Sequence, residues 1–298
     1  MKRRFFTLDV FTQRKFAGNP LAVVLEADGL DTAAMQTIAR EFNFPETVFV
    51  SPPADGQHRA AVRIFTPTAE LPFAGHPTVG TAVLLAILDG GRPARLMLEE
   101  KIGNVACHFE PREADIGYVR FAAPSLPVSA GDLPGKTEQA AALSIAPEDI
   151  GFEGAVPSRW SAGVPFSFVP LRTLDAVARC HPDPALFETV FGIDGPALVY
   201  VFCAQTAEAG HDFHARMFAP KRGIPEDPAT GSAAAAFAGL LAASGRYGEG
   251  EHHFRIEQGY EMGRASLIEL GLKIGGGRPT AATIGGSAVI VTEGTITA

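Results

Sequence analysis

The chain has 298 residues, of which 46% are hydrophobic and 19% are charged, and its formal net charge is -8 at pH 7. This length accommodates one large domain or two modest ones with a proper core, and the composition is that of an ordinary globular protein. The negative charge argues against nucleic acid or an acidic membrane surface as the main partner.

The cysteines and the N-terminus indicate the cellular compartment. The three cysteines are widely spaced and odd in number, which fits neither a disulfide framework nor a zinc knuckle, so we expect reduced thiols. The first residues are basic, but the unbroken apolar core of a signal peptide does not follow them. The longest apolar runs are too short to span a bilayer. We therefore expect a cytoplasmic protein with no membrane partner.

The first 122 residues mix strand and helix patterns. Residues 5–11 and 21–27 are rich in β-forming side chains and flank a Gly-Asn-Pro turn, which predicts two strands. Asp31 precedes apolar residues at helical spacing, so we expect it to cap a helix that ends near Phe42. The remaining predicted elements are strands at 47–51 and 60–67, a helix at about 77–88 and short strands from 95 to 121.

A segment between Ala122 and Gly135 has the proline, serine and glycine content of a linker. The order of elements then recurs. We expect a helix near 137–144, strands around 166–169 and 197–204, the strand segment HARMFAP, a loop and a helix. In the tail, the glycines at Gly275 and Gly285 predict tight turns between strands.

Two short motifs occur twice, about 150 residues apart. Arg63–Pro67 (RIFTP) matches Arg216–Pro220 (RMFAP), and Pro-x-x-Gly-Thr-Ala from Pro77 matches Pro-x-x-Gly-Ser-Ala from Pro228. In this alignment the intervening loop is two residues longer in the first half. We interpret the match as a duplicated α/β unit. The alternative is that two unrelated helices both begin with proline.

The two matched loops are candidate anion sites. Proline favours the first turn of a helix, so His76 and Asp227, which precede the prolines, stand at the expected N-caps. Gly80 and Gly231 would keep the first turn slim, so that backbone N–H groups reach a ligand. If the halves face each other, the two helix ends would hold a small carboxylate. The plainer interpretation is that Asp227 is only a cap and His76 only a surface residue.

The sequence resembles the PhzF-like family of phenazine biosynthesis isomerases, which shares the two-domain fold of diaminopimelate epimerase. The resemblance covers essentially the whole chain and departs at Ala265, where proline is expected. It implies an α+β fold of two pseudo-symmetric domains, each a curved, mostly antiparallel sheet or barrel around a central helix. The domains would be residues 1–122 with 279–298 and residues 123–278. Five segments carry the resemblance: DVFTQRKFAGNPLAVV (9–24), REFNFPETVFV (40–50), FAGHPTVGTA (73–82), EDPATGSAAA (226–235) and QGYEMGR (258–264).

The resemblance implies a catalytic glutamate, Glu46, with His76 and Asp227 as the other catalytic residues. It places four further residues against the substrate: Asn19, Gly75, Gly231 and Ser232. Diaminopimelate epimerase uses two thiols, one from each loop. These loops contain no cysteine, so we expect no two-thiol chemistry.

The reaction implied is the isomerisation of trans-2,3-dihydro-3-hydroxyanthranilate, a small cyclic carboxylate. A proton leaves C3 and a proton is delivered to C1 of the same ring, and one carboxylate can do both. The apolar neighbours of Glu46 suit this role, because burial raises the pKa of a carboxyl group and strengthens the base. The scheme requires no metal and no organic cofactor. The resemblance also implies a homodimer.

Two other functions stay open. One is racemisation of an amino acid by a non-thiol pair, with His76 or Asp227 as the second acid. The other is a ligand-binding or regulatory protein that kept the pocket without turnover. A zinc site at His211-x-x-His214 is not expected, because a strand would send the two rings to opposite faces.

Overall fold

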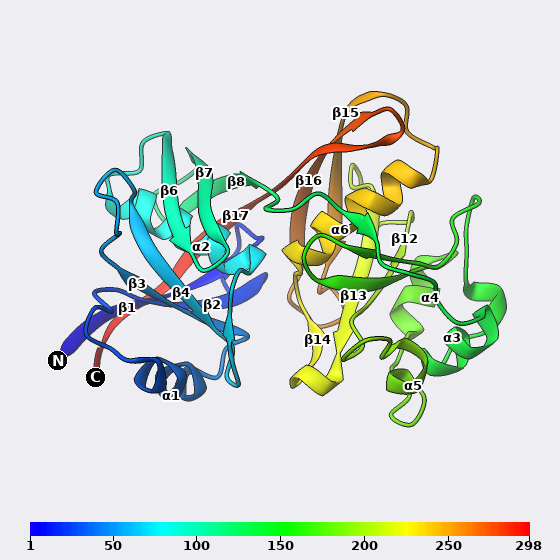
Figure 1. Ribbon diagram of the computed structural model, residues 1–298, viewed down its shortest axis with the longest axis horizontal. Coiled ribbons are helices and arrows are strands. Elements are labelled where there is room, and N and C mark those ends of the chain that lie inside the picture. Colours follow the sequence, from blue (N-terminus) through cyan, green and yellow to red (C-terminus); the bar gives the residue numbers. More distant parts are fainter. The chain divides into compact units, whose positions relative to one another are not determined.

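The computed structural model describes residues 1–298 apart from the side chain of Arg222, and it divides into two compact units. The first unit is Met1–Ala122 with Gly285–Ala298, and the second is Ala123–Ile284 (Figure 1). The chain returns to the first unit at residue 285, where the sequence analysis expects 279. The last strand, β17 (Arg278–Thr297), runs unbroken through both positions, so no local pattern marks the crossing.

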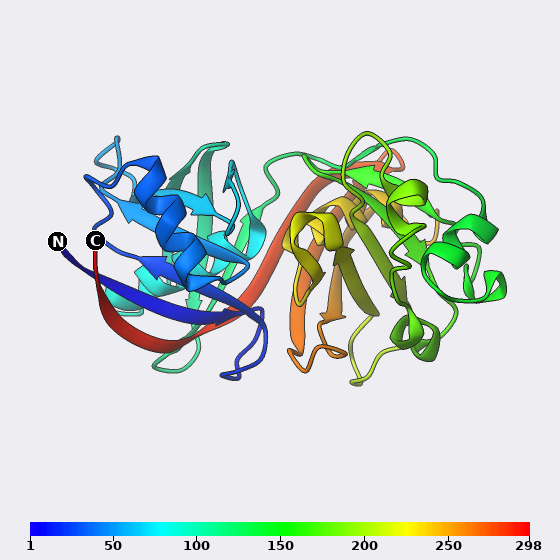
Figure 2. The same ribbon diagram turned by 90° about the horizontal axis from the view of Figure 1, so that it is seen from below.

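Antiparallel pairs dominate the sheet of the first unit. The parallel pairs are β2 with β3 and β4 with β6. The N-terminal strand β1 also pairs with the end of β17, so both termini belong to this unit (Figure 2). The strands are β1 (Lys2–Val10), β2 (Asn19–Val24), β3 (Glu46–Ser51), β4 (Ala60–Phe65), β5 (Glu70–Leu71), β6 (Ala94–Glu100), β7 (Gly103–Pro111) and β8 (Ile116–Ala122).

Two helices complete the first unit. Helix α1 (Thr32–Phe42) begins at Asp31, whose carboxylate accepts a hydrogen bond from the Ala34 N–H as the sequence predicts. Helix α2 (Gly75–Leu88) contacts six strands and is buried on every side, which explains its uniformly apolar sequence. A side chain at Gly80 would meet Val10 and Leu21. Gly80 therefore lets the helix approach the strands, rather than opening its first turn to a ligand.

The second unit repeats this arrangement around helix α6 (Gly231–Ala243), which is likewise buried nearly all round. Three short helices, α3 (Lys136–Ala142), α4 (Leu174–Arg179) and α5 (Phe187–Phe191), cover one side of the sheet (Figure 1), and the sequence analysis predicts only the first of them. The strands are β9 (Val128–Ser129), β10 (Ser158–Ser161), β11 (Pro165–Pro170), β12 (Val199–Cys203), β13 (Phe213–Ala219), β14 (Ile224–Asp227), β15 (Gly250–Gln258) and β16 (Ser266–Gly275). The unit also contains the 3₁₀ turns Pro147–Asp149 and Pro220–Arg222.

The same side-chain bonds recur in the two units, which confirms the duplication. In the first unit Glu99 accepts hydrogen bonds from the backbone N–H groups of Ala54 and Asp55 and contacts a ring nitrogen of His58. In the second unit Glu257 makes the same three contacts, with Ala207, Glu208 and His211. Likewise, bidentate ion pairs join Arg63 to Glu70 and Arg216 to Glu226.

The alignment of the two helix starts differs from the sequence prediction. The first helical backbone bonds run from Thr78 N to Ala74 O and from Ala234 N to Thr230 O, so Ala74 and Thr230 are the N-caps. His76 therefore corresponds to Ser232, and the loop before the helix is longer in the second unit. The sequence alignment matched Pro77 with Pro228, but Pro77 lies in the first turn of α2 and Pro228 lies before α6. Proline is tolerated at both kinds of position, so a shared proline does not mark equivalent helix positions.

One of the two glycine clusters in the tail forms the predicted turn, and the other does not. Gly276 and Gly277 form the expected tight turn between β16 and β17, with φ values of 61° and 70°. Gly285 and Gly286 instead lie inside β17. Their missing side chains leave room for Tyr118 and Phe11, respectively. Close packing, not a turn, explains this second pair.

Among the described helices, none is both long and apolar enough to cross a membrane.

Candidate active site

Glu46 lies at the start of a buried strand in the first unit. It is the first residue of β3, where it pairs with Leu21 of the parallel strand β2, and it is 9% exposed. Asn19 begins β2 and is completely buried. The two residues thus lie at one end of neighbouring parallel strands. The Phe-Pro sequence before Glu46 ends the preceding segment and lets the strand begin at the acid.

His76 contacts Glu46 from the first turn of α2. Its Nε2 lies 3.3 Å from Oε2 of Glu46, and its side chain is buried. Burial lowers the pKa of His76 to about 3, although a hydrogen bond with the backbone of Pro20 acts in the opposite direction. The imidazole is therefore neutral at pH 7, and the contact with Glu46 is not an ion pair.

The tautomer of His76 follows from its partners. Proline has no N–H, so the ring donates to the Pro20 carbonyl. Nε2 makes no hydrogen bond within the described part of the chain, which leaves Nδ1 as the donor. Nε2 then carries the lone pair and can accept a hydrogen bond from a ligand N–H or O–H.

Asp227 is held by a small hydrogen-bond network in the second unit. It is the last residue of β14, and Thr230 Oγ1 donates to its Oδ2 at 2.5 Å. Gln258 Nε2 donates to the Asp227 carbonyl at 2.7 Å and to Thr230 Oγ1 at 2.9 Å. The Thr230 N–H in turn donates to Gln258 Oε1. Asp227 is thus not the N-cap that the sequence predicts, because three residues separate it from the helix.

Gln258 and its neighbour explain the QGYEMGR segment, to which the sequence analysis assigned no role. Gly259 has φ +77°, and a side chain there would meet the backbone of Pro228 within 2.6 Å. The segment therefore supports the loop from Asp227 to Thr230. The sequence does not indicate this support, because the hydrogen bond joins Gln258 of β15 to Thr230, a residue 28 positions earlier in the chain.

The four residues that the resemblance places against the substrate lie at the start of a strand, in the case of Asn19, or in the first turn of one of the two central helices. Gly75 and Gly231 are the first residues of α2 and α6, and both are buried. Ser232 follows Gly231 and is half-buried. The first N–H groups of each helix have no partner within their own helix, and the helix dipole favours an anion there.

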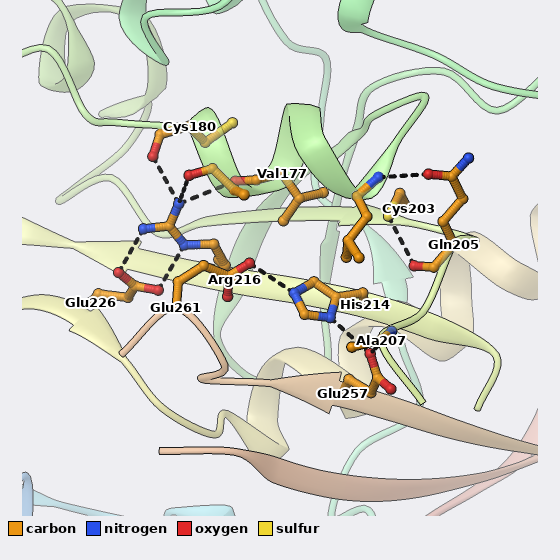
Figure 3. Close-up of polar contacts among 12 residues, drawn as sticks. Val177, Cys180, Cys203, Gln205, Ala207, His214, Arg216, Glu226, Glu257 and Glu261 are labelled. Carbon is orange, nitrogen blue, oxygen red and sulfur yellow. Dashed lines mark hydrogen bonds and ion pairs between the residues drawn. The ribbon is translucent and has the colours of Figure 1, made fainter. Parts of the chain in front are cut away.

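The two histidines of His211-x-x-His214 converge instead of pointing apart. Nδ1 of His211 lies 2.7 Å from Glu257. Nδ1 of His214 lies 2.8 Å from the same carboxylate, and its Nε2 lies 2.8 Å from Glu261 (Figure 3). The expectation of opposite faces was wrong because His211 precedes β13. Among the residues that the structure describes, no group of three or more His, Cys, Asp or Glu is arranged to hold a metal ion.

Comparisons with known proteins find similar proteins that match nearly the whole chain. A family model described as phenazine biosynthesis-like protein matches residues 8–294. An uncharacterised isomerase of Mesorhizobium japonicum is 46% identical over 98% of both chains. The trans-2,3-dihydro-3-hydroxyanthranilate isomerase of Pseudomonas fluorescens is 35% identical, also over 98% of both chains.

The fold has a solved counterpart. The crystal structure of a Bacillus anthracis phenazine biosynthesis protein of the PhzF family matches all of both chains with a TM-score of 0.88 at 27% identity. This likeness confirms the expected α+β fold of two pseudo-symmetric domains.

Proposed function

The chain belongs to the family of phenazine biosynthesis-like proteins and is an isomerase of that family, and we propose that Glu46 moves the proton in its reaction. The proposed substrate is a small cyclic carboxylate such as trans-2,3-dihydro-3-hydroxyanthranilate, the compound named for the Pseudomonas fluorescens relative. The observation that carries the proposal is the contact between a buried Glu46 and a neutral His76 at one end of β2 and β3.

In the proposed reaction Glu46 acts first as base and then as acid. Its carboxylate takes the proton from C3 of the ring, and the resulting carboxylic acid returns a proton to C1, so Glu46 ends the cycle as it began. General acid–base catalysis of this kind contributes about 10²–10⁴ in rate. Burial supports the role, because a carboxylate with little solvation is a stronger base toward a C–H bond.

His76 and Asp227 complete the proposed catalytic set by binding polar groups of the substrate. The lone pair of His76 Nε2 would accept a hydrogen bond from the substrate amine or hydroxyl, next to the acid that moves the proton. Asp227 is held by Thr230 and, through its carbonyl, by Gln258. We assign Asn19, Gly75, Gly231 and Ser232 to substrate binding. The helix N-termini suit a carboxylate.

The state of the cysteines supports a carboxylate mechanism over a thiol mechanism. All three thiols are buried, and burial raises the pKa of Cys180 to about 12 and that of Cys203 to about 11. Burial also raises the pKa of Cys107 far above its ordinary value. None of them lies in the loops that lead into α2 or α6. Nucleophilic or basic thiolates are therefore not accessible at neutral pH.

The test is isomerisation of trans-2,3-dihydro-3-hydroxyanthranilate in D₂O, followed by mass spectrometry and NMR of the product. The wild-type chain is expected to place deuterium at C1. Glu46→Gln keeps the shape but removes the base, so it should lose at least about 10²-fold in kcat. The control is Glu41→Gln, which makes the same change of charge at an exposed residue of α1.

Two outcomes would contradict the proposal separately. Turnover by Glu46→Gln at the wild-type rate would exclude Glu46 as the proton carrier. A wild-type chain that binds the compound but neither converts it nor exchanges its C–H protons would exclude this substrate. Inversion at Cα of an amino acid, with solvent exchange there, would favour a racemase instead.

A further inference from the structure

A second buried acid, Glu100, lies under the first turn of α2. It is the last residue of β6 and is 8% exposed. Its Oε1 is 2.7 Å from Oγ1 of Thr78, and the same hydroxyl is 2.8 Å from the carbonyl oxygen of Ala74, the N-cap of the helix. Glu100 thus reaches the turn that carries His76, although it does not contact His76.

The contacts around Thr78 bear on the protonation of Glu100. A hydroxyl has one hydrogen, and the Ala74 carbonyl can only accept, so the bond between Thr78 and Ala74 uses that hydrogen. The short contact between Thr78 Oγ1 and Glu100 Oε1 then requires a hydrogen from Glu100. Glu100 supplies it only as a carboxylic acid.

The charged and titratable neighbours of Glu100 agree with a neutral acid. Its Oε2 is buried and makes no hydrogen bond to any described residue. Strand β7 contributes the thiol of Cys107, which interacts with Glu100 electrostatically and which burial keeps protonated. The adjacent Glu99 binds His58, and Lys101 is exposed and lies 3.6 Å from Glu70. A buried carboxylate with no cation beside it is strongly disfavoured.

The second unit carries an amide at the same position. In the parallel pairs, Ala61 lies opposite Glu99 in the first unit and His214 lies opposite Glu257 in the second. Glu100 therefore corresponds to Gln258, which supports the start of α6 through Thr230. A glutamine and a protonated glutamate have the same shape, and both can donate one hydrogen bond and accept another. A carboxylate cannot donate.

We propose that Glu100 is a positioning residue that supports the His76 turn of α2 as a neutral acid, in the way that Gln258 supports the start of α6. When Glu100 ionises it can only accept, so the single hydrogen of the Thr78 hydroxyl can no longer serve both Glu100 and the Ala74 carbonyl, and the turn loosens. The role in catalysis rests on the proposed function of His76, whereas the protonation of Glu100 does not.

The pH range follows from the environment of the acid. Burial raises the pKa of Glu100 to about 8 from an ordinary value of 4.5. Between these two values the folded chain keeps a proton that the unfolded chain loses. The stability that this proton contributes is therefore complete below about pH 4.5, declines as the pH rises toward 8 and stays low above it.

The first test measures the melting temperature of the wild type and of Glu100→Gln from pH 4.5 to 9. The variant cannot ionise, so its melting temperature relative to wild type should rise by several degrees up to about pH 8 and then level off. The control, Glu113→Gln, removes an exposed acid and should show no such trend. A constant difference between Glu100→Gln and wild type would overturn the proposal.

The second test measures kcat and KM against pH with trans-2,3-dihydro-3-hydroxyanthranilate. Glu100→Leu, which lacks the hydrogen bond, should lower kcat at all pH values. Glu100→Gln should restore kcat at neutral pH and keep it above pH 8, where the wild type declines. An alkaline decline that is identical in Glu100→Gln would overturn the positioning role. The melting experiment uses no substrate, so it tests the proton on Glu100 even if the proposed substrate is wrong.

Discussion

The histidines show how the surroundings of one residue set its charge. His76 is buried, and burial outweighs the hydrogen bond to the Pro20 carbonyl and keeps the ring neutral. His214 is also buried, and burial acts to lower its pKa, but hydrogen bonds to Glu261 and Glu257 outweigh this and raise the pKa. A neutral ring has one N–H, whereas both nitrogens of His214 face carboxylates. His214 is therefore an imidazolium, and the pair illustrates that burial alone does not decide protonation.

This contrast gives a prediction for 15N-labelled histidine NMR. At pH 7 we expect His76 as the neutral tautomer with a proton on Nδ1, and His214 as the doubly protonated ring. The His76 signal should not titrate until the pH falls toward 3, because its pKa is about 3. Assignment would use His76→Asn and His214→Asn. A His76 signal that titrates near pH 6.5 would contradict the account of its burial.

Short helices in this fold depend on side chains from other elements. Helix α4 has six residues, too few to be stable alone. Arg216 of β13 donates to the carbonyl oxygens of Val177 and Cys180 at the end of that helix, and it pairs with Glu226 through its other nitrogens (Figure 3). It also donates to the carbonyl oxygen of Ala178. The matching arginine of the first unit, Arg63, pairs with Glu70 and donates to the hydroxyl of Thr32 rather than to helix carbonyl groups.

We therefore predict that Arg216→Lys destabilises the chain more than Arg63→Lys does. Lysine cannot make the planar, bidentate pair with the glutamate or reach three carbonyl groups at once. Chemical denaturation should show a loss of about 1–3 kcal/mol for Arg216→Lys, because buried carbonyl groups are left without their hydrogen bonds. Arg63 is more exposed, so Arg63→Lys should lower the free energy of unfolding by no more than about 1 kcal/mol. Equal losses would show that the carbonyl contacts contribute nothing.

At the scale of the whole molecule, β17 links the two units by belonging to both. It begins in the second unit and ends in the first, where it pairs with β1 from Lys2↔Thr297 to Val10↔Ala288. The sheet of the first unit is therefore completed by the last residues of the chain. The cytoplasmic location expected from the cysteines and the N-terminus stays a prediction, as does the homodimer that the resemblance implies.

Removing residues 287–298 should consequently affect the first unit more than the second. Amides of β1 would lose their partners and should exchange with D₂O at rates typical of fraying segments, while α6 in the second unit keeps its protection. Hydrogen exchange with mass spectrometry measures both in one sample. Removal of Ala298 alone is the control. Loss of protection in α6 to the same extent would contradict the independence of the two cores.

The sequence by itself determined most of the secondary structure and the duplication, because the patterns that predict them involve residues close together in the chain. The strand-forming runs, the Asp31 cap and the apolar central helices follow from neighbouring residues, and repeated motifs revealed the duplication. Three features could not be predicted from neighbouring residues, because each depends on contacts with distant parts of the chain. They are the alignment of the helix starts, the role of Gly285 and Gly286, and the convergence of His211 and His214. The tertiary structure also revealed Gln258 and Glu100 as supports, because their partners come from another strand, loop or helix. Local preference sets where elements form, but the charge and hydrogen bonds of a buried side chain are decided by what packs against it.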